Sequence, residues 1–209
     1  MKDYQKIFNE LAANYASAKD ALIIRPLYTE NIKETTCRIT ISDDCALALY
    51  LLLSDDENRI ESVQVPTWLL DEWNVTEKAA FKQALLNTES RYAPVYTDNI
   101  FLEQYKSIKE FSNKKNVNVI MVTTSRKTNG AISMFYPDVK EKIAAGLNSS
   151  FYVAFTSIHE CMVHPAGSIE PKAIKRNITE TNRMFGSDDT FTNNVFFYDK
   201  DNKTFKVIA

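Results

Sequence analysis

The chain has 209 residues, of which 44% are hydrophobic and 25% are charged, and its formal net charge is −2. These values are ordinary for a globular protein with one good core or two small ones. The slight negative charge leaves no excess of cations for phosphate backbones, so direct nucleic-acid binding is not favoured. Glycine is scarce, and neither a Walker-type loop nor a GxGxxG is present, which argues against a standard nucleotide-binding motif.

Features of the chain also bear on its compartment. The N-terminal segment is amphipathic, carries acidic residues and lacks the apolar run of a signal peptide. The longest apolar run, Ala46–Leu53, is too short to span a bilayer. Three cysteines, an odd number, predict free thiols rather than a disulfide framework. We therefore expect a cytoplasmic protein without membrane contact, structural metal or cofactor.

The first part of the chain predicts one helix followed by strands. Residues 3–18 carry apolar side chains at helical spacing. Pro26 places the first strand at an edge of its sheet or at a strand end. Residues 46–53 fit either a strand or a short helix, because periodicity alone does not decide between them. We favour the strand. The predicted strand segments are 21–28, 37–42, 46–53 and 60–65.

The middle of the chain predicts helices that cover a sheet. Thr67 and Thr76 are placed to cap two helices between residues 67 and 87. A short extended segment follows, and Asp98 is then placed to cap a third helix over residues 98–110. The residues of this third helix that are expected to face inward are Phe101, Leu102, Tyr105 and Ile108.

The last part of the chain alternates between strands and helices. A helix that Pro137 starts and Gly146 ends is predicted, and another over residues 170–184, while residues 131–136 fit either a strand or a helix. Strands are predicted at 116–123, 151–155, 158–163, 195–198 and 204–208. The whole pattern predicts an α+β fold over residues 1–209, a single domain that could consist of two lobes, with a mainly antiparallel sheet covered by helices.

The segment Ser157–His164 holds both histidines and one cysteine. On a strand, His159 and Cys161 would share one face, and Glu160 and His164 the other. His159 and Cys161 could then act as a base and its nucleophile, and a small hydrolase could use His159 and Glu160 with help from Ser157 or Cys161. Zinc usually needs more protein ligands than the His159–Cys161 pair supplies, and HExxH is absent. The plainer interpretation is a histidine that is satisfied by hydrogen bonds near a strand start.

Two kinds of polar loop offer further candidates. Residues 125–130 follow a predicted strand, and Arg126, Lys127 and Asn129 there could hold an anion through charge and backbone N–H groups. A polar hairpin turn explains the same residues. Carboxylates at Asp43-Asp44 and Asp55–Glu57 could hold Mg²⁺, but we expect solvated turn residues at both.

Several stretches resemble a known family: LIIRPLY, VPTWLLDEWNVTEKAAFKQALLNT, the long segment from VIMVTTSRKTNGAISMFYP to FTSIHECMVHPAG, and Thr181-Asn182 in the late helix. Through these stretches, which extend from about residue 20 to residue 209, the chain resembles an uncharacterised bacterial family of unknown function. Members of that family typically have Leu-Pro-Ser-Ser ahead of Ile-His-Glu, where this chain has Ala154–Ser157. The resemblance points to the Ser157–Glu160 segment as the site and implies no particular reaction.

Three classes of function stay open. We favour a non-catalytic protein-binding module, because the chain is rich in aromatic residues and has no strong catalytic motif. In one version, a phage or mobile-element protein places its acidic surface on the basic nucleic-acid-binding surface of a host defence nuclease of the CRISPR type. The alternatives are a small hydrolase that uses His159 and Glu160, and a small-anion sensor that uses Arg126 and Lys127.

Overall fold

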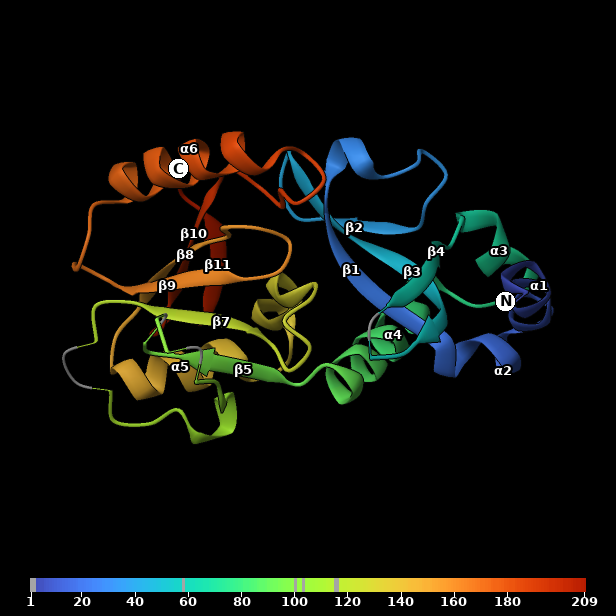
Figure 1. The fold of residues 1–209 in the computed structure, drawn as a ribbon, viewed down its shortest axis with the longest axis horizontal. Helices are drawn as coiled ribbons and strands as arrows, with labels where there is room; N and C mark the ends of the chain where they lie inside the picture. Colours follow the sequence, from blue (N-terminus) through green and yellow to red (C-terminus); the bar gives the residue numbers. More distant parts are fainter. Residues whose placement is uncertain (1–2, 58, 100, 103, 115–116) are drawn as a thin grey trace.

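The computed structural model describes residues 3–57, 59–99, 101–102, 104–114 and 117–209. It confirms the α+β class, and its strands divide between two antiparallel sheets that lie side by side along the long axis of the molecule (Figure 1). We call the part with the four-stranded sheet, up to residue 92, the N-terminal lobe. The part with the seven-stranded sheet, from residue 94 on, is the C-terminal lobe. One cluster of buried hydrophobic residues runs through both lobes.

The N-terminal lobe is organised by one long strand. Its strands are β1 (Leu22–Tyr28), β2 (Arg38–Thr40), β3 (Cys45–Asp55) and β4 (Ile60–Gln64). Strand β3 pairs with β1 along one side and with β2 and β4 along the other. It is buried from Cys45 to Leu52 without interruption, which is typical of a strand covered on both faces and confirms the strand assignment. Strand β1 lies at the edge, as Pro26 predicts.

Four α-helices of the described residues pack around this sheet. Two details of their prediction are wrong, one helix being interrupted and one cap lying at a different residue. The helices are α1 (Tyr4–Ala12), α2 (Tyr15–Ala18), α3 (Thr67–Glu72) and α4 (Glu77–Arg91). The single helix predicted over 3–18 is interrupted at Asn14, which has extended backbone and accepts a hydrogen bond from Ser17 N to start α2. Thr67 lies inside α3, because Pro66 occupies the cap position. Thr76 caps α4 as predicted.

The C-terminal lobe is a seven-stranded sheet in the order β11-β10-β8-β9-β7-β5-β6. Helix α6 (Pro171–Phe185) covers one face, where Ile174 and Ile178 pack on Ala154 and Val195 (Figure 1). Helix α5 (Val139–Leu147) packs into the main core. The strands are β5 (Pro94–Thr97), β6 (Lys106–Ser107), β7 (Ile120–Thr124), β8 (Phe151–Ala154), β9 (Cys161–Pro165), β10 (Val195–Asp199) and β11 (Thr204–Val207).

The helix predicted over residues 98–110 is wrong. Strands β5 and β6 pair there as a hairpin, and a short 3₁₀ turn, η3 (Ile108–Glu110), follows. Asp98 binds the Lys114 ammonium instead of capping a helix. Ile108 is buried as predicted, but the side chains of Phe101 and Leu102 are 91% and 59% exposed. Backbone pairing across the hairpin therefore outweighed the local helical pattern; residues 100 and 103 lie outside the described part.

One further helix end differs from prediction in the C-terminal lobe, and one open assignment is resolved. Helix α5 continues past Gly146 to Leu147, and its C-cap is Asn148, whose backbone is left-handed with φ 53°. Gly146 is needed for packing, because a Cβ there would lie 2.3 Å from the ring of Phe111. Residues 131–136, which fitted either type of element, mostly form a 3₁₀ helix, η4 (Gly130–Phe135). No helix in the described residues is long and apolar enough to cross a bilayer.

The turn before β3 joins the two lobes through Asp44. Its carboxylate accepts hydrogen bonds from Thr192 Oγ1 at 2.7 Å, Asn193 N at 2.9 Å and Asn194 Nδ2 at 2.9 Å. The expectation of a solvated turn residue is therefore wrong for Asp44. Hydrogen bonds to an ionised carboxylate are stronger than neutral ones, so this residue fixes the C-terminal loop on the N-terminal lobe.

We expect Asp44→Ala to lower the free energy of unfolding by about 2–4 kcal/mol, because it leaves several part-buried donors without an acceptor. Asp43→Ala is the matched control, since Asp43 is exposed and accepts one hydrogen bond, from Asn194 Nδ2 at 3.0 Å. Urea denaturation followed by circular dichroism measures both variants. Equal losses in the two variants would show that Asp44 does not join the lobes.

The three cysteines generate a prediction on reactivity and pH. All three thiols are free and buried, and burial raises the pKa of Cys37 to about 12 and that of Cys45 to about 11. Cysteine in an unfolded chain has a pKa of about 8.5, so between about pH 8.5 and 11 the folded state keeps protons that the unfolded state has released. We therefore expect the free energy of unfolding to fall as pH rises through this window.

A thiol reagent such as DTNB should react slowly with the native protein and fully after unfolding without reductant. Fewer than three reactive thiols per chain after unfolding would contradict the assignment of free cysteines. A free energy of unfolding that stays level through the alkaline window would contradict the raised pKa values.

Candidate functional site

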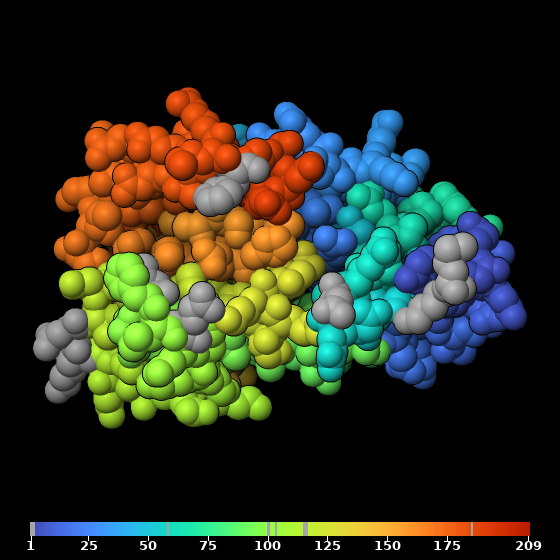
Figure 2. All heavy atoms as spheres, viewed as in Figure 1, coloured from blue at the N-terminus to red at the C-terminus, as the bar shows by residue number. Residues whose placement is uncertain are grey.

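The residues predicted as sites from the sequence lie in two loops that meet near the junction of the lobes. Residues 125–129 connect β7 to η4, and residues 155–160 connect β8 to β9. In the space-filling view, the yellow segment that contains residues 125–135 lies against the blue and cyan surface of the N-terminal lobe (Figure 2). The structure thus brings the predicted anion loop and the histidine segment together.

The histidine segment is a loop rather than the strand predicted from residue 158. Strand β9 begins at Cys161, so the argument that His159 and Cys161 share a strand face is wrong. The backbone groups of the loop find other partners, since Ile158 N donates to Asp189 O at 2.7 Å and His159 N donates to Ser157 Oγ at 2.9 Å. Cys161 is fully buried, and burial raises the pKa of its thiol, which makes it a poor nucleophile.

A hydrogen bond from Asn129 N to His159 Nδ1, 3.1 Å long, joins the two loops. Asn129 has left-handed backbone with φ 51°, a conformation that asparagine tolerates better than most residues. Thr123 Oγ1 donates to His159 O at 2.7 Å on the same side. Gly130 permits this approach, because a Cβ there would lie 2.1 Å from His159 O and 2.2 Å from Thr123 Oγ1. The ring of His159 is therefore held in one position.

The other ring nitrogen of His159 faces a carboxylate. Nε2 lies 3.4 Å from Asp189 Oδ1. Because Nδ1 accepts the Asn129 N–H, the neutral tautomer of the ring carries its own proton on Nε2. Neither nitrogen then offers a free lone pair for removing a proton from a substrate.

A pocket of 300 Å³ opens beside His159. Glu160 lines it and accepts a hydrogen bond from Thr156 Oγ1 at 3.2 Å. Ser157 also lines it, and among the described residues no hydrogen bond joins its hydroxyl to either ring nitrogen of His159. Within the same described part, no group of three His, Cys, Asp or Glu residues could hold a metal ion. The full lining is Thr156, Ser157, His159, Glu160, Thr181 and Asp189.

The family-like pair Thr181-Asn182 positions the wall of this site. Thr181 lines the pocket from α6. Asn182 is buried, and its Nδ2 donates to Thr192 O at 3.1 Å and to Asn193 Oδ1 at 3.0 Å. The pair thus connects the His159 pocket to the loop that holds Asp44.

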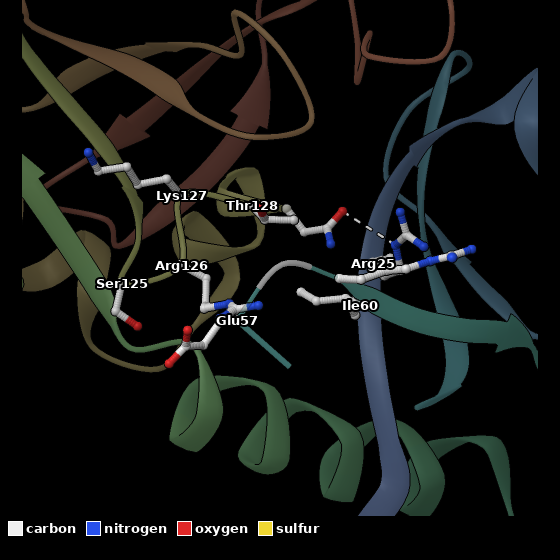
Figure 3. Close-up of a pocket in the computed structure, with 9 residues that line it drawn as sticks. Arg25, Glu57, Ile60, Ser125, Arg126, Lys127 and Thr128 are labelled. Carbon is white, nitrogen blue, oxygen red and sulfur yellow. Dashed lines mark hydrogen bonds between the residues drawn. The ribbon is translucent and has the colours of Figure 1, made fainter. Parts of the chain in front are cut away.

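A second, larger pocket of 460 Å³ lies between the lobes (Figure 3). Its walls come from β1, from the β3–β4 turn and from the loop before η4. Two of the cations predicted to hold an anion line it but are engaged by the protein. Arg126 pairs with Asp55 at 3.2 Å, and the Lys127 ammonium lies 4.6 Å from the centre of the Tyr105 ring. The lining residues are Arg25, Glu57, Arg59, Ile60, Ser125, Arg126, Lys127, Thr128 and Asn129.

The residue that sequence analysis missed in this pocket is Arg25. Its Nε donates to Asn129 Oδ1 at 3.3 Å, across the junction of the lobes. The available signal was a single cation inside the otherwise apolar strand LIIRPLY. Asn129, which sequence analysis did name, contacts Arg25 with its side chain and His159 with its backbone, and so connects the two pockets.

Comparison with known proteins identifies a family. The model of a family described as "Family of unknown function (DUF5688)" matches residues 2–200. No curated protein and no solved structure matches the chain. An activity must therefore be argued from the geometry of the two pockets.

Proposed function

The chain belongs to the DUF5688 family, to which no function is assigned, and from the geometry of its site we propose that it acts by binding a partner rather than by catalysing a reaction. The proposal keeps the favoured sequence prediction of a non-catalytic, cytoplasmic binding module. One observation carries it: the acceptor nitrogen of the His159 ring, Nδ1, already takes a hydrogen bond from Asn129 N.

General base catalysis needs a lone pair within hydrogen-bond reach of the proton to be removed. The lone pair on Nδ1 of His159 is occupied by the Asn129 amide. A Ser–His pair also needs the hydroxyl to meet the ring, whereas the Ser157 hydroxyl contacts the His159 backbone N–H. His159 therefore serves as a connection between loops.

A hydrolase is the second candidate, because Ser157, His159 and Glu160 do line one pocket. For that function the ring would have to turn or exchange its proton, so that Nε2 could face a substrate. Such a movement would also break the hydrogen bond to Asn129, which makes the two candidates separable by substitution.

The proposed partner is a protein with a basic nucleic-acid-binding surface. The net charge of −2 and the exposed aromatic side chains of Trp68 and Phe101 support it. The finer version, in which a phage or mobile-element protein inhibits a host defence nuclease, belongs to the same proposal. A pull-down from the native host, read by mass spectrometry, should yield a stoichiometric basic partner. A chain that elutes alone, with a small molecule bound, would contradict the protein-partner proposal.

We expect His159→Ala to lower the free energy of unfolding by about 1–3 kcal/mol, because it leaves the buried Asn129 N–H without an acceptor. His159→Asn should recover much of this loss, since an amide oxygen can lie near the position of Nδ1. Glu160→Gln should leave stability nearly unchanged. Thermal unfolding of the three variants measures these differences.

An enzyme would respond in the opposite way. His159→Asn and Glu160→Gln would both fold normally and lose catalytic activity in the native host by roughly a hundredfold or more, as expected for a missing acid or base. Loss of activity in both folded variants would overturn the binding proposal. Full activity of His159→Asn in the native host, together with a lower free energy of unfolding of His159→Ala, would support the binding proposal.

A further inference from the structure

We propose that the pocket between the lobes binds a small organic anion, and that Arg25 holds its carboxylate or phosphate group. This inference rests on the proposed function, since it names a ligand class for a protein that acts by binding. The pocket volume of 460 Å³ lies within the range typical of small-molecule sites. Its walls come from three separate segments of the chain (Figure 3).

Arg25 is a half-buried cation that has no carboxylate partner among the described residues. Neutral groups orient it instead. Its Nε donates to Asn129 Oδ1 at 3.3 Å, its Nη1 donates to Ser62 Oγ at 3.2 Å, and its guanidinium lies 4.9 Å from the centre of the Tyr50 ring. A buried charge without a counterion is costly, so a site that keeps one fixed is suited to an external anion. The planar guanidinium matches the two oxygens of a carboxylate or phosphate.

The other arginines of the pocket differ from Arg25 in this respect. Arg126 is paired with Asp55, and Arg59 is paired with Glu61. These pairs neutralise much of the charge at their ends of the pocket. The anionic group of a ligand therefore belongs beside Arg25, with the polar side chains of Ser125 and Thr128 along the rest of the wall.

Glu57 places a negative charge at the end of the pocket away from Arg25. It is exposed and lines the pocket, and in Figure 3 its carboxylate lies near Arg126, away from Arg25. A carboxylate there repels a second negative group and accepts hydrogen bonds. The pocket thus suits a ligand with one anionic group at Arg25 and a hydroxyl or amine group towards Glu57.

The test is a titration of the full chain with two probes, inorganic phosphate and 4-hydroxybutyrate, which has one carboxylate and one hydroxyl group, against sodium chloride at matched ionic strength. Backbone amide shifts of residues 125–129 in two-dimensional NMR spectra report binding. We expect saturable shifts with phosphate, 4-hydroxybutyrate or both, and the probe that binds more tightly identifies the anion class. Arg25→Gln should weaken binding by at least about tenfold. Arg176→Gln, which removes an exposed arginine on α6 outside the pocket, should leave it unchanged.

A second variant keeps the test decisive if Arg25→Gln folds poorly. Glu57→Gln removes an exposed carboxylate from the pocket and should tighten phosphate binding by about three- to fivefold. Shifts that do not saturate with either probe would overturn the anion site, and so would shifts that neither Arg25→Gln nor Glu57→Gln alters. Such a failure would leave the proposed function standing, because the His159 variants test that function separately.

Discussion

The hydrogen bond from the Asn129 amide to the His159 ring is the interaction on which the arrangement of both pockets depends. It requires left-handed backbone at Asn129 and the absence of a side chain at Gly130. With its amide fixed on His159, Asn129 directs its side-chain oxygen to Arg25 in the other lobe. One residue therefore sets the distance between the histidine loop, the anion loop and the N-terminal sheet.

The lobes are joined at a second place by Asp44 and the loop that it holds. Asn182 on α6 contacts the same loop from behind, through Thr192 O and Asn193 Oδ1. Side-chain hydrogen bonds of this kind are directional, so they fix an orientation that apolar packing alone would leave less defined. The two connections, at Asp44 and at Asn129, hold the walls of the pocket between the lobes in place. A ligand at Arg25 would then meet a largely preformed site, which lowers the entropic cost of binding.

Much of the fold followed from local patterns in the sequence. The uninterrupted apolar run of β3 favoured a buried strand over a short helix, and Pro26 indicated an edge or a strand end for β1, which the structure has at the edge. Predictions failed where distant residues decide the structure. The helix expected from Asp98 is replaced by a hairpin, and Asp98 binds Lys114. The local pattern around Phe101 and Leu102 contained no sign of this pairing.

The candidate site was predicted only in part, for the same reason. His159, Glu160 and Asn129 were named from residue type, and the structure places them in adjoining loops. Their roles depend on partners far away in the chain, since Asn129 meets His159 across 30 residues and Arg25 across 104. No spacing rule connects such positions, so the structural role of His159 and the exposure of Arg25 to a pocket became visible only in three dimensions.

The central claim is that the His159 ring accepts a hydrogen bond through Nδ1 and so serves structure. Long-range ¹H–¹⁵N correlation spectra of the folded protein measure which ring nitrogen carries the proton. We predict that the neutral tautomer carries its proton on Nε2 and leaves Nδ1 unprotonated, and that the Asn129 amide exchanges slowly with solvent. A proton on Nδ1, or an Asn129 amide that exchanges as fast as a solvent-exposed one, would contradict this account.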